Sequence, residues 1–210
     1  GLLATEATDM GTLTANGFET INIALNHGPT ATDKETDIAA FTADKVTAIN
    51  LTGSGYVDIA NAATTLAVTI DGTELTGNGA ATNLGLDVAG NLVAGSTVRG
   101  SGVVDTFDLG TVGSTYQGNA GNDNFNATAV TQLENGAVWN TLDGGAGTDT
   151  VKVTANAVTL ADSNFAKMSN MEKLTVDADG GGGDVSVTTG GFFDANFTNA
   201  TVTLLGKDTD

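Results

Sequence analysis

The amino-acid sequence predicts an all-β protein in which short strands stack into a parallel β-roll or β-helix-like coil, with a β-sandwich as the alternative. Three observations favour this fold. Strand-forming Val and Thr are frequent, while 29 glycines and a single proline indicate many tight turns. Apolar and polar residues alternate in runs of about five, bounded by Gly, Asn or Asp. Related segments also recur along the chain, which favours stacked rungs over one closed barrel.

The alternating runs extend over most of the chain. They predict strands at 21–25, 48–51, 66–70, 150–153, 173–176, 184–187 and 200–204. Helix signals are confined to a turn or two at 161–168 and a second candidate at 33–43.

Two kinds of segment recur. Residues 51–58 match residues 98–105, and a phrase of one hydrophobic residue followed by a short β run appears at 17–23, 45–51 and 170–176. Recurring strand-turn units of this kind are typical of stacked repeats.

The net charge of −18 comes from 25 acidic against 7 basic side chains, although 40% of the residues are hydrophobic. The chain therefore has enough apolar surface to fold, and a disordered polyelectrolyte is a poor description. Two carboxylates about 5 Å apart repel by roughly 3 kcal/mol at an effective dielectric near 20. Either the acids lie on a solvated face or cations lie between them.

The composition argues against several classes of partner and site. Arg99 is the only arginine, so we expect no nucleic-acid partner, and no apolar stretch is long enough to predict insertion in a membrane. With no cysteine and one histidine, His27, the chain lacks the ligands of a conventional zinc site and the partners of Cys-His catalysis.

Two glycine-rich turns contain the candidate metal-binding residues. Residues 142–151 contain Gly-Gly-x-Gly-x-Asp followed by an apolar residue two positions later, and residues 117–125 contain the same pattern with Asn119 for the second glycine. Glycines let such turns direct carbonyl oxygens inward, and the aspartate adds charge. Hard oxygen ligands of this kind suit Ca²⁺ better than a transition metal.

The two turns resemble the calcium-binding nonapeptides of RTX proteins, in which turns on one side of a parallel β-roll recur every 18 residues. Asp105 lies 18 residues before Asp123, so the 98–105 segment is in register with the better turn. Asp149 lies 26 residues beyond Asp123, and a loop within 126–140 can absorb the excess. The predicted calcium-site residues are Gly100, Gly102, Asp105, Gly118, Asn119, Gly121, Asp123, Gly144, Gly145, Gly147 and Asp149.

The isolated turns, together with the phrases at 17–23 and 170–176, resemble calcium-dependent surface-layer proteins of Gram-negative bacteria. That resemblance implies type I secretion to the extracellular cell surface and self-association into a lattice. It also implies a C-terminal export signal outside this segment, and attachment to surface polysaccharide through another domain. The ending at 204–210 reads like the start of a further turn, which indicates a fragment.

We expect a structural role and no enzymatic activity. The first alternative is an adhesin or stalk segment of the RTX type that displays a binding domain elsewhere. The second is a polysaccharide lyase or epimerase on a β-helix, which would need a cleft with convergent acids and a Lys or Arg. No Gly-x-Ser-x-Gly motif accompanies His27, which we expect in a surface turn.

The expected organisation is a β-rich repeat region at 1–97, the calcium-binding turns at 98–155 with their insertion near 126–140, and a further β-rich repeat region at 156–210. The acidic glycine run at 177–184 is either a flexible turn or another calcium loop, and it does not fit an EF-hand because position 12 is Thr188. Phe192, Phe193 and Phe197 are expected as a core plug or an assembly contact.

Overall fold

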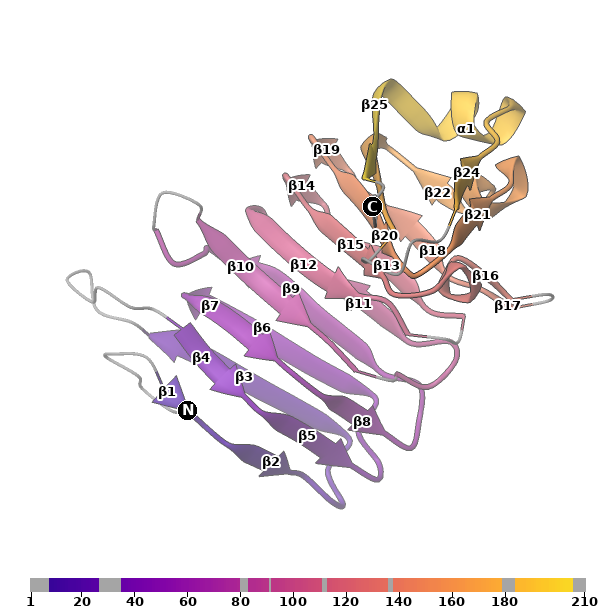
Figure 1. Ribbon diagram of the computed structural model, residues 1–210. Helices are drawn as coiled ribbons and strands as arrows, with labels where there is room; N and C mark the ends of the chain where they lie inside the picture. The colour runs from indigo at the N-terminus through magenta and orange to yellow at the C-terminus, as the bar shows by residue number, and fades with distance from the viewer. Residues whose placement is uncertain are drawn as a thin grey trace.

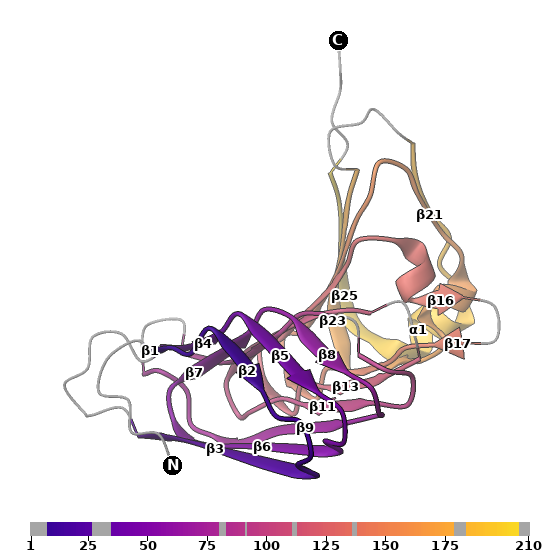
Figure 2. The same ribbon diagram turned by 90° about the horizontal axis from the view of Figure 1, so that it is seen from below.

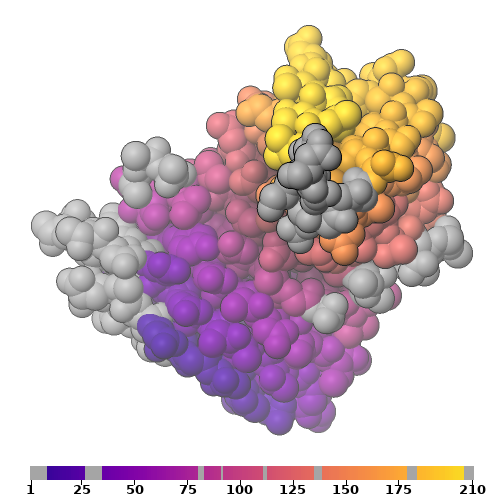
Figure 3. All heavy atoms as spheres, in the orientation of Figure 1, coloured from indigo at the N-terminus to yellow at the C-terminus, as the bar shows by residue number. Residues whose placement is uncertain are grey.

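The computed structural model describes residues 8–26, 35–79, 83–90, 92–110, 113–135, 138–178 and 184–205. Short parallel strands stack rung upon rung, as the sequence predicts, and the N- and C-terminal segments lie at opposite ends of the molecule (Figures 1 and 3). Figure 2 shows the N-terminal rungs side by side, with β23 and β25 turning away from them. The fold is therefore a parallel coil rather than a β-sandwich.

Two large sheets form the walls of the coil. The nine-stranded sheet contains, in spatial order, β1 (Thr8–Asp9), β4 (Glu35–Ile38), β7 (Tyr56–Ile59), β10 (Leu84–Val88), β12 (Val104–Asp108), β15 (Asn124–Ala127), β20 (Thr150–Thr154), β23 (Met171–Asp177) and β25 (Phe197–Leu205). The seven-stranded sheet contains β22 (Met168–Ser169), β18 (Thr141–Asp143), β13 (Thr115–Gln117), β11 (Thr97–Arg99), β9 (Thr69–Leu75), β6 (Ala48–Ser54) and β3 (Thr20–Asn26).

Smaller sheets close the corners. A parallel three-stranded sheet holds β2 (Thr12–Thr14), β5 (Ala40–Ala43) and β8 (Ala62–Thr64). Parallel pairs are formed by β14 (Ala120–Gly121) with β19 (Ala146–Gly147) and by β21 (Val158–Leu160) with β24 (Val185–Val187). Among the described strands, only β16 (Glu134–Asn135) and β17 (Val138–Trp139) pair antiparallel. The helices within the described ranges are the 3₁₀ turns Val130–Gln132 and Asp162–Phe165 and the short α1 (Gly191–Asn196).

The core runs along the inside of the coil because alternate residues of each strand point inward. One column stacks Ile49, Ile70, Val98, Tyr116 and Leu142, all at most 1% exposed. From the opposite wall, the ring of Phe107 lies 5.1 Å from that of Phe125 and 6.0 Å from that of Tyr116.

The predicted spacings are confirmed as strand registers. Phe107 pairs with Phe125 in the parallel ladder of β12 and β15, and Phe125 pairs with Val151 in that of β15 and β20. The excess residues of the longer rung form the 3₁₀ turn Val130–Gln132 and the β16–β17 hairpin, inside the predicted 126–140 insertion. The sheets pair without a break across positions 97 and 155, where the sequence divided the chain.

The helix expected at 33–43 is wrong for the residues described there, which form β4 and β5. Buried and less buried residues alternate along each of these short strands, and a bend at Ala39 separates them. Ile38 and Phe41 are both 0% exposed, and their spacing of three comes from two strands meeting at a corner rather than from one helical stripe. The helical turn expected within 161–168 is confirmed as the 3₁₀ turn Asp162–Phe165.

The phenylalanine cluster closes one corner of the C-terminal end. Phe193 and Phe197 are 7% and 6% exposed, and both rings contact Phe165, so these two belong to the core. Phe192 remains 50% exposed. No helix in the described ranges is long and apolar enough to cross a membrane.

Candidate metal centre

Three aspartates lie one above another where the glycine-rich turns enter the nine-stranded sheet. Asp105 lies in β12, while Asp123 and Asp149 immediately precede β15 and β20, and each of the three is 0% exposed. The parallel register of these strands aligns the aspartates, because the residues that follow them pair along the sheet.

Each carboxylate accepts a backbone hydrogen bond from the preceding rung. The N–H of Asp105 donates to Oδ1 of Asp123, and the N–H of Asp123 donates to Oδ1 of Asp149, both at 2.8 Å. Glu172 extends the series, since its Oε2 accepts the N–H of Asp149 at 2.8 Å. We call Asp105, Asp123, Asp149 and Glu172 the inner carboxylate ladder.

Two carboxylate oxygens of this ladder are buried without a hydrogen-bond partner, Oδ2 of Asp123 and Oδ2 of Asp149. Backbone carbonyls lie beside them. A Cβ atom placed on Gly118 would lie 2.2 Å from Oδ2 of Asp123 and 2.4 Å from the carbonyl oxygen of Gly144. A buried, unpartnered ionised group is costly, so these two positions call for a proton or a cation.

The cradle recurs one rung later. A Cβ on Gly144 would lie 2.7 Å from Oδ2 of Asp149 and 2.1 Å from the carbonyl oxygen of Asn170. Glycine is therefore required at both positions for space, because any side chain would displace the oxygens.

Asp105 differs from the other two aspartates because its carboxylate is fully hydrogen-bonded. Ser101 donates from its backbone N–H to Oδ2 at 2.6 Å and from its hydroxyl to Oδ1 at 2.8 Å. Oδ1 also accepts the N–H of Leu86 at 2.7 Å. The serine thus satisfies this turn with protein groups alone, and no oxygen of Asp105 is left without a partner.

Burial makes ionisation of the three aspartates unfavourable. Desolvation raises the pKa of Asp105 to about 7, against the lowering effect of its hydrogen bonds from Ser101 and Leu86. Desolvation, together with the neighbouring charges of Asp105 and Asp149, raises the pKa of Asp123 to about 8, against the lowering effect of the hydrogen bond from the Asp105 N–H. The pKa of Asp149 is raised as well, again mainly by burial.

The remaining predicted residues shape the turns. Gly147 has φ 152°, and a Cβ there would lie 1.5 Å from the carbonyl oxygen of Gly121, so β14 and β19 can stack only because glycine is present. Gly145 similarly abuts the backbone of Asn119, whose own side chain donates from Nδ2 to the carbonyl of Gly100 at 2.8 Å.

Gly100 and Gly102 differ in their surroundings. A Cβ on Gly100 would lie 2.4 Å from Oδ2 of Asp105, so this glycine lies against the inner carboxylate ladder. Gly102 is exposed, with open space where a Cβ would project, and the structure does not bring it to the carboxylates.

The potential metal ligands described along the inner carboxylate ladder are oxygen atoms of carboxylates and backbone carbonyls. That set fits Ca²⁺, which takes oxygen ligands from Asp, Glu and main-chain carbonyls. In the described part of the chain, no three His, Cys, Asp or Glu side chains converge on one metal position. A cation here would therefore depend on carbonyls such as those of Gly144 and Asn170 as well as on one aspartate.

The sequence reasoning missed Glu172. A usable signal was present, because an acidic residue stands two positions before each of the inward residues Phe125, Val151 and Leu174, which pair in one row of the sheet. The glycine pattern is absent before Glu172, so a search for Gly/Asp turns passes over it. The glycines of the acidic run at 177–184 lie outside the described residues, as does His27.

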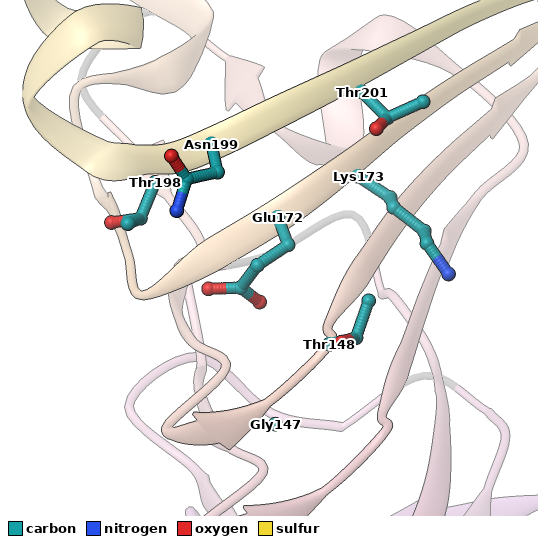
Figure 4. Close-up of a pocket in the computed structure, with 7 residues that line it drawn as sticks. All are labelled: Gly147, Thr148, Glu172, Lys173, Thr198, Asn199 and Thr201. Atoms are coloured by element: carbon teal, nitrogen blue, oxygen red, sulfur yellow. The ribbon is translucent and has the colours of Figure 1, made fainter.

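The ladder ends at a polar cavity of about 420 Å³ beside its last turn (Figure 4). The carboxylate of Glu172 and the side chain of Thr148 are part of its wall, together with Lys173 on β23 (Figure 4). Residues of β25 complete the lining, which comprises Gly147, Thr148, Glu172, Lys173, Thr198, Asn199 and Thr201.

A second acidic column lies on the outer face of the nine-stranded sheet. Asp9 pairs with Asp37, Asp37 with Asp58, and Asp58 with Asp87 on four adjacent strands. We call these four residues the outer aspartate column. Asp87 pairs in turn with Thr106, so Asp58 is one residue out of register with Asp105 and points to the opposite face, although the sequence match of 51–58 to 98–105 aligned them.

Comparisons with protein-family models, curated proteins and solved structures find no match to this chain.

Proposed function

We propose that this chain is a calcium-dependent structural part of a secreted bacterial surface array. The observation that supports calcium best is the pair of buried, unpartnered oxygens, Oδ2 of Asp123 and Oδ2 of Asp149, each beside a backbone carbonyl. The coil itself supports a structural role, because its residues form stacked rungs with a continuous core.

The ladder residues would act as a folding switch. Asp123 and the carbonyl of Gly144 would hold one cation, and Asp149 and the carbonyl of Asn170 a second. Bound Ca²⁺ would supply the positive charge that the buried carboxylates lack. Without it, Asp123 must either stay protonated or place a negative charge in a dry turn, and both states weaken the stacking of adjacent rungs.

Several weak sites suit such a switch better than one strong site. Extracellular calcium modules bind with a Kd of about 10⁻⁴ to 10⁻³ M. A tenfold excess of calcium over Kd then adds about 1.4 kcal/mol for each site. Two sites in adjacent rungs would let the chain stay loosely folded where calcium is scarce and fold outside the cell, which fits export of an unfolded chain by type I secretion.

The proposal is tested by titrating calcium into chelator-treated protein while recording circular dichroism and thermal unfolding, then imaging the saturated protein by negative-stain electron microscopy. We expect a cooperative rise in β signal near millimolar calcium and ordered sheets in the images. Magnesium is the matched control, because it dehydrates reluctantly and prefers octahedral sites. Folding without sheets would favour an adhesin or stalk, and a fold unaffected by chelator would refute the calcium switch.

The double variant Asp123→Asn with Asp149→Asn sharpens this test. It removes both unpartnered oxygens while preserving side-chain shape. The calcium response of unfolding temperature should disappear in this variant and persist in Asp105→Asn, whose carboxylate Ser101 already satisfies.

A further inference from the structure

One inward-facing row of the nine-stranded sheet changes from uncharged to acidic along the coil. Thr36 pairs with Val57, and Val57 pairs with Leu86, on three adjacent strands. These three side chains are at most 2% exposed. The row continues from Leu86 to Asp105, since the residues that follow these two are partners in the next strand pair. From Asp105 onward the row consists of the inner carboxylate ladder.

The rungs before Asp105 contain no fully buried carboxylate among their described residues. The buried polar side chains of this part are those of Thr36, Ser96 and Ser101, and none of them ionises in the physiological range. The rest of the buried interior is apolar, as at Ile70, which is 0% exposed. Apolar packing and backbone pairing hold these rungs, and neither of them depends on a bound ion.

Asp105 is the first acidic residue of the row, and its hydrogen bonds from Ser101 and Leu86 leave none of its oxygens unpartnered. The turn before it differs from the next two. Asn119 and Gly145, which occupy the place of Ser101 in those turns, have φ 72° and 93°, whereas the φ of Ser101 is negative. Of the three turns, the first alone brings the N–H at this place to the carboxylate, and the other two leave an oxygen without a partner.

We propose that the coil is divided at Asp105 into two folding blocks. The first block, formed by the described residues of 8–110, folds without calcium, and the second, formed by those of 113–178, folds only with it (Figure 1). The division rests on the proposed calcium switch and names the rungs that the switch controls. In chelator the first block persists while the second opens.

The contacts across the boundary allow the first block to stand alone. The N–H of Asp105 donates to Oδ1 of Asp123 at 2.8 Å, and the ring of Phe107 lies 5.1 Å from that of Phe125. Opening of the second block removes these partners, but it takes no donor from the carboxylate of Asp105, because Ser101 and Leu86 both belong to the first block. No buried oxygen of Asp105 is therefore left unsatisfied.

The first block also provides a template for the second. In repeat coils, folding propagates by adding each rung to a neighbour that is already formed. β11 and β12 would present ordered edges to β13 and β15, with which they pair in parallel. Calcium would then order only the rungs that follow, starting with the turn of Asp123.

Hydrogen–deuterium exchange of the full chain, read by mass spectrometry, tests the division strand by strand. The protein is compared in calcium at tenfold excess over Kd, in magnesium and in chelator, all at one pH. We expect the amides of β7, β9 and β10 to be equally protected in all three conditions. Protection of β15, β18 and β20 should fall about 100-fold without calcium, because two sites contribute about tenfold each.

Two buried serines provide a matched pair of variants for the boundary. Ser101→Ala removes a hydroxyl that donates to Asp105, whereas Ser114→Ala removes a hydroxyl that has no partner, and both side chains are at most 3% exposed. In chelator, Ser101→Ala should raise the exchange rates of β12 about tenfold, since the carboxylate loses a donor. Ser114→Ala should leave these rates unchanged, and equal effects of the two variants would overturn the boundary at Asp105.

The double variant Asp123→Asn with Asp149→Asn is the control for the second block. It should make the protection of β15 and β20 independent of calcium and leave that of β7 and β10 as in the wild type. A calcium response of β7 and β10 as large as that of β20 in the wild type would overturn the division and leave the calcium switch standing. Protection of β20 that is identical in calcium and in chelator would refute the switch itself, and the division with it.

Discussion

The inner carboxylate ladder and the outer aspartate column place similar numbers of acidic groups on successive strands, yet their surroundings differ. The inner aspartates, Asp105, Asp123 and Asp149, are 0% exposed and accept backbone hydrogen bonds from neighbouring rungs. The outer aspartates stand side by side on the surface of the sheet, with Asp9 exposed and Asp58 and Asp87 half-buried. Water can screen the outer charges, whereas only protein groups, a proton or a cation can satisfy the inner ones.

This comparison shows that strand register, more than the number of acidic residues, determines whether a carboxylate faces solvent or is buried. Asp87 is followed by Val88 and preceded by Leu86, which is 0% exposed and donates its N–H to the buried Asp105. A shift of one residue therefore exchanges a solvent-facing charge for a buried one.

The largest expected effect comes from filling the inner cradle. Gly118→Ala should destabilise the calcium-loaded protein by about 3 kcal/mol, because the new methyl group collides with a carboxylate oxygen and a backbone carbonyl. Chemical denaturation measures this loss. Gly102→Ala is the control, since open space surrounds that position, and it should change the unfolding free energy by less than about 0.5 kcal/mol. Equal effects of the two substitutions would contradict the cradle.

The second-largest effect is a difference in stability between a variant and the wild type that changes sign when calcium is added. Asp123→Asn removes a buried charge and its unpartnered oxygen, so in chelator at pH 8 the variant should be more stable than the wild type by about 1 to 2 kcal/mol. In calcium the order should invert, because the variant gains nothing from the ion. Thermal melts of both proteins with and without calcium make the comparison. A variant that is less stable in both conditions would indicate a purely structural aspartate.

The outer column should respond to pH rather than to calcium. Burial, followed by the charges of Asp58 and Asp108, raises the pKa of Asp87 from 3.8 to about 6. The folded state then binds this proton more tightly than the unfolded chain does. The protonated Asp87 carboxyl therefore contributes fully to folding stability below pH 3.8, and this contribution is lost as pH rises through 6.

Replacing Asp87 therefore has a pH-dependent effect. Asp87→Asn should stabilise the protein by about 1 kcal/mol at pH 7.5, after allowance for solvent screening, and by almost nothing at pH 4. Urea unfolding at the two pH values tests this. Asp194→Asn, on the exposed side of α1, serves as the control, and a gain that is independent of pH would contradict ionisation of the buried Asp87 carboxyl as its cause.

The smallest effect belongs to the outer face of the seven-stranded sheet, where a cation lies among polar side chains. Arg99 contacts the carboxylate of Asp71 at 3.5 Å and donates from Nε to Gln117 at 3.2 Å. Arg99→Gln should cost about 0.5 kcal/mol at low salt and nothing at 1 M salt, because an exposed ion pair is weak and easily screened. Lys152→Gln, which breaks a pair with Asp177 at 3.9 Å, is the matched surface substitution and should behave alike in the same denaturation assay.

Regular turns made part of this molecule predictable from sequence. The spacing of Asp105, Asp123 and Asp149 predicted the registers of β12, β15 and β20, because a Gly/Asp turn has a fixed length and a strand follows it directly. The insertion within 126–140 was predicted from the same spacing, because Asp149 lies 26 rather than 18 residues beyond Asp123.

Other features depend on contacts that pattern alone does not encode. Asp58 appeared equivalent to Asp105 until the pairing with Asp87 showed it on the opposite face. Ser101 stands between Gly100 and Gly102, and no sequence pattern marks it, yet its hydroxyl and N–H complete the hydrogen bonding of Asp105. Glu172 joins the ladder through a turn that lacks the glycines used to find the others.

The inner ladder also gives the coil a direction. Each carboxylate accepts a hydrogen bond from an amide of the rung before it. Asp149 accepts the N–H of Asp123, and Asp123 accepts that of Asp105. Damage at one aspartate consequently deprotects an amide on its N-terminal side and leaves the hydrogen bond on its C-terminal side in place. Fraying of this coil is thereby polarised, and a rung becomes complete only when the chain that follows it has folded.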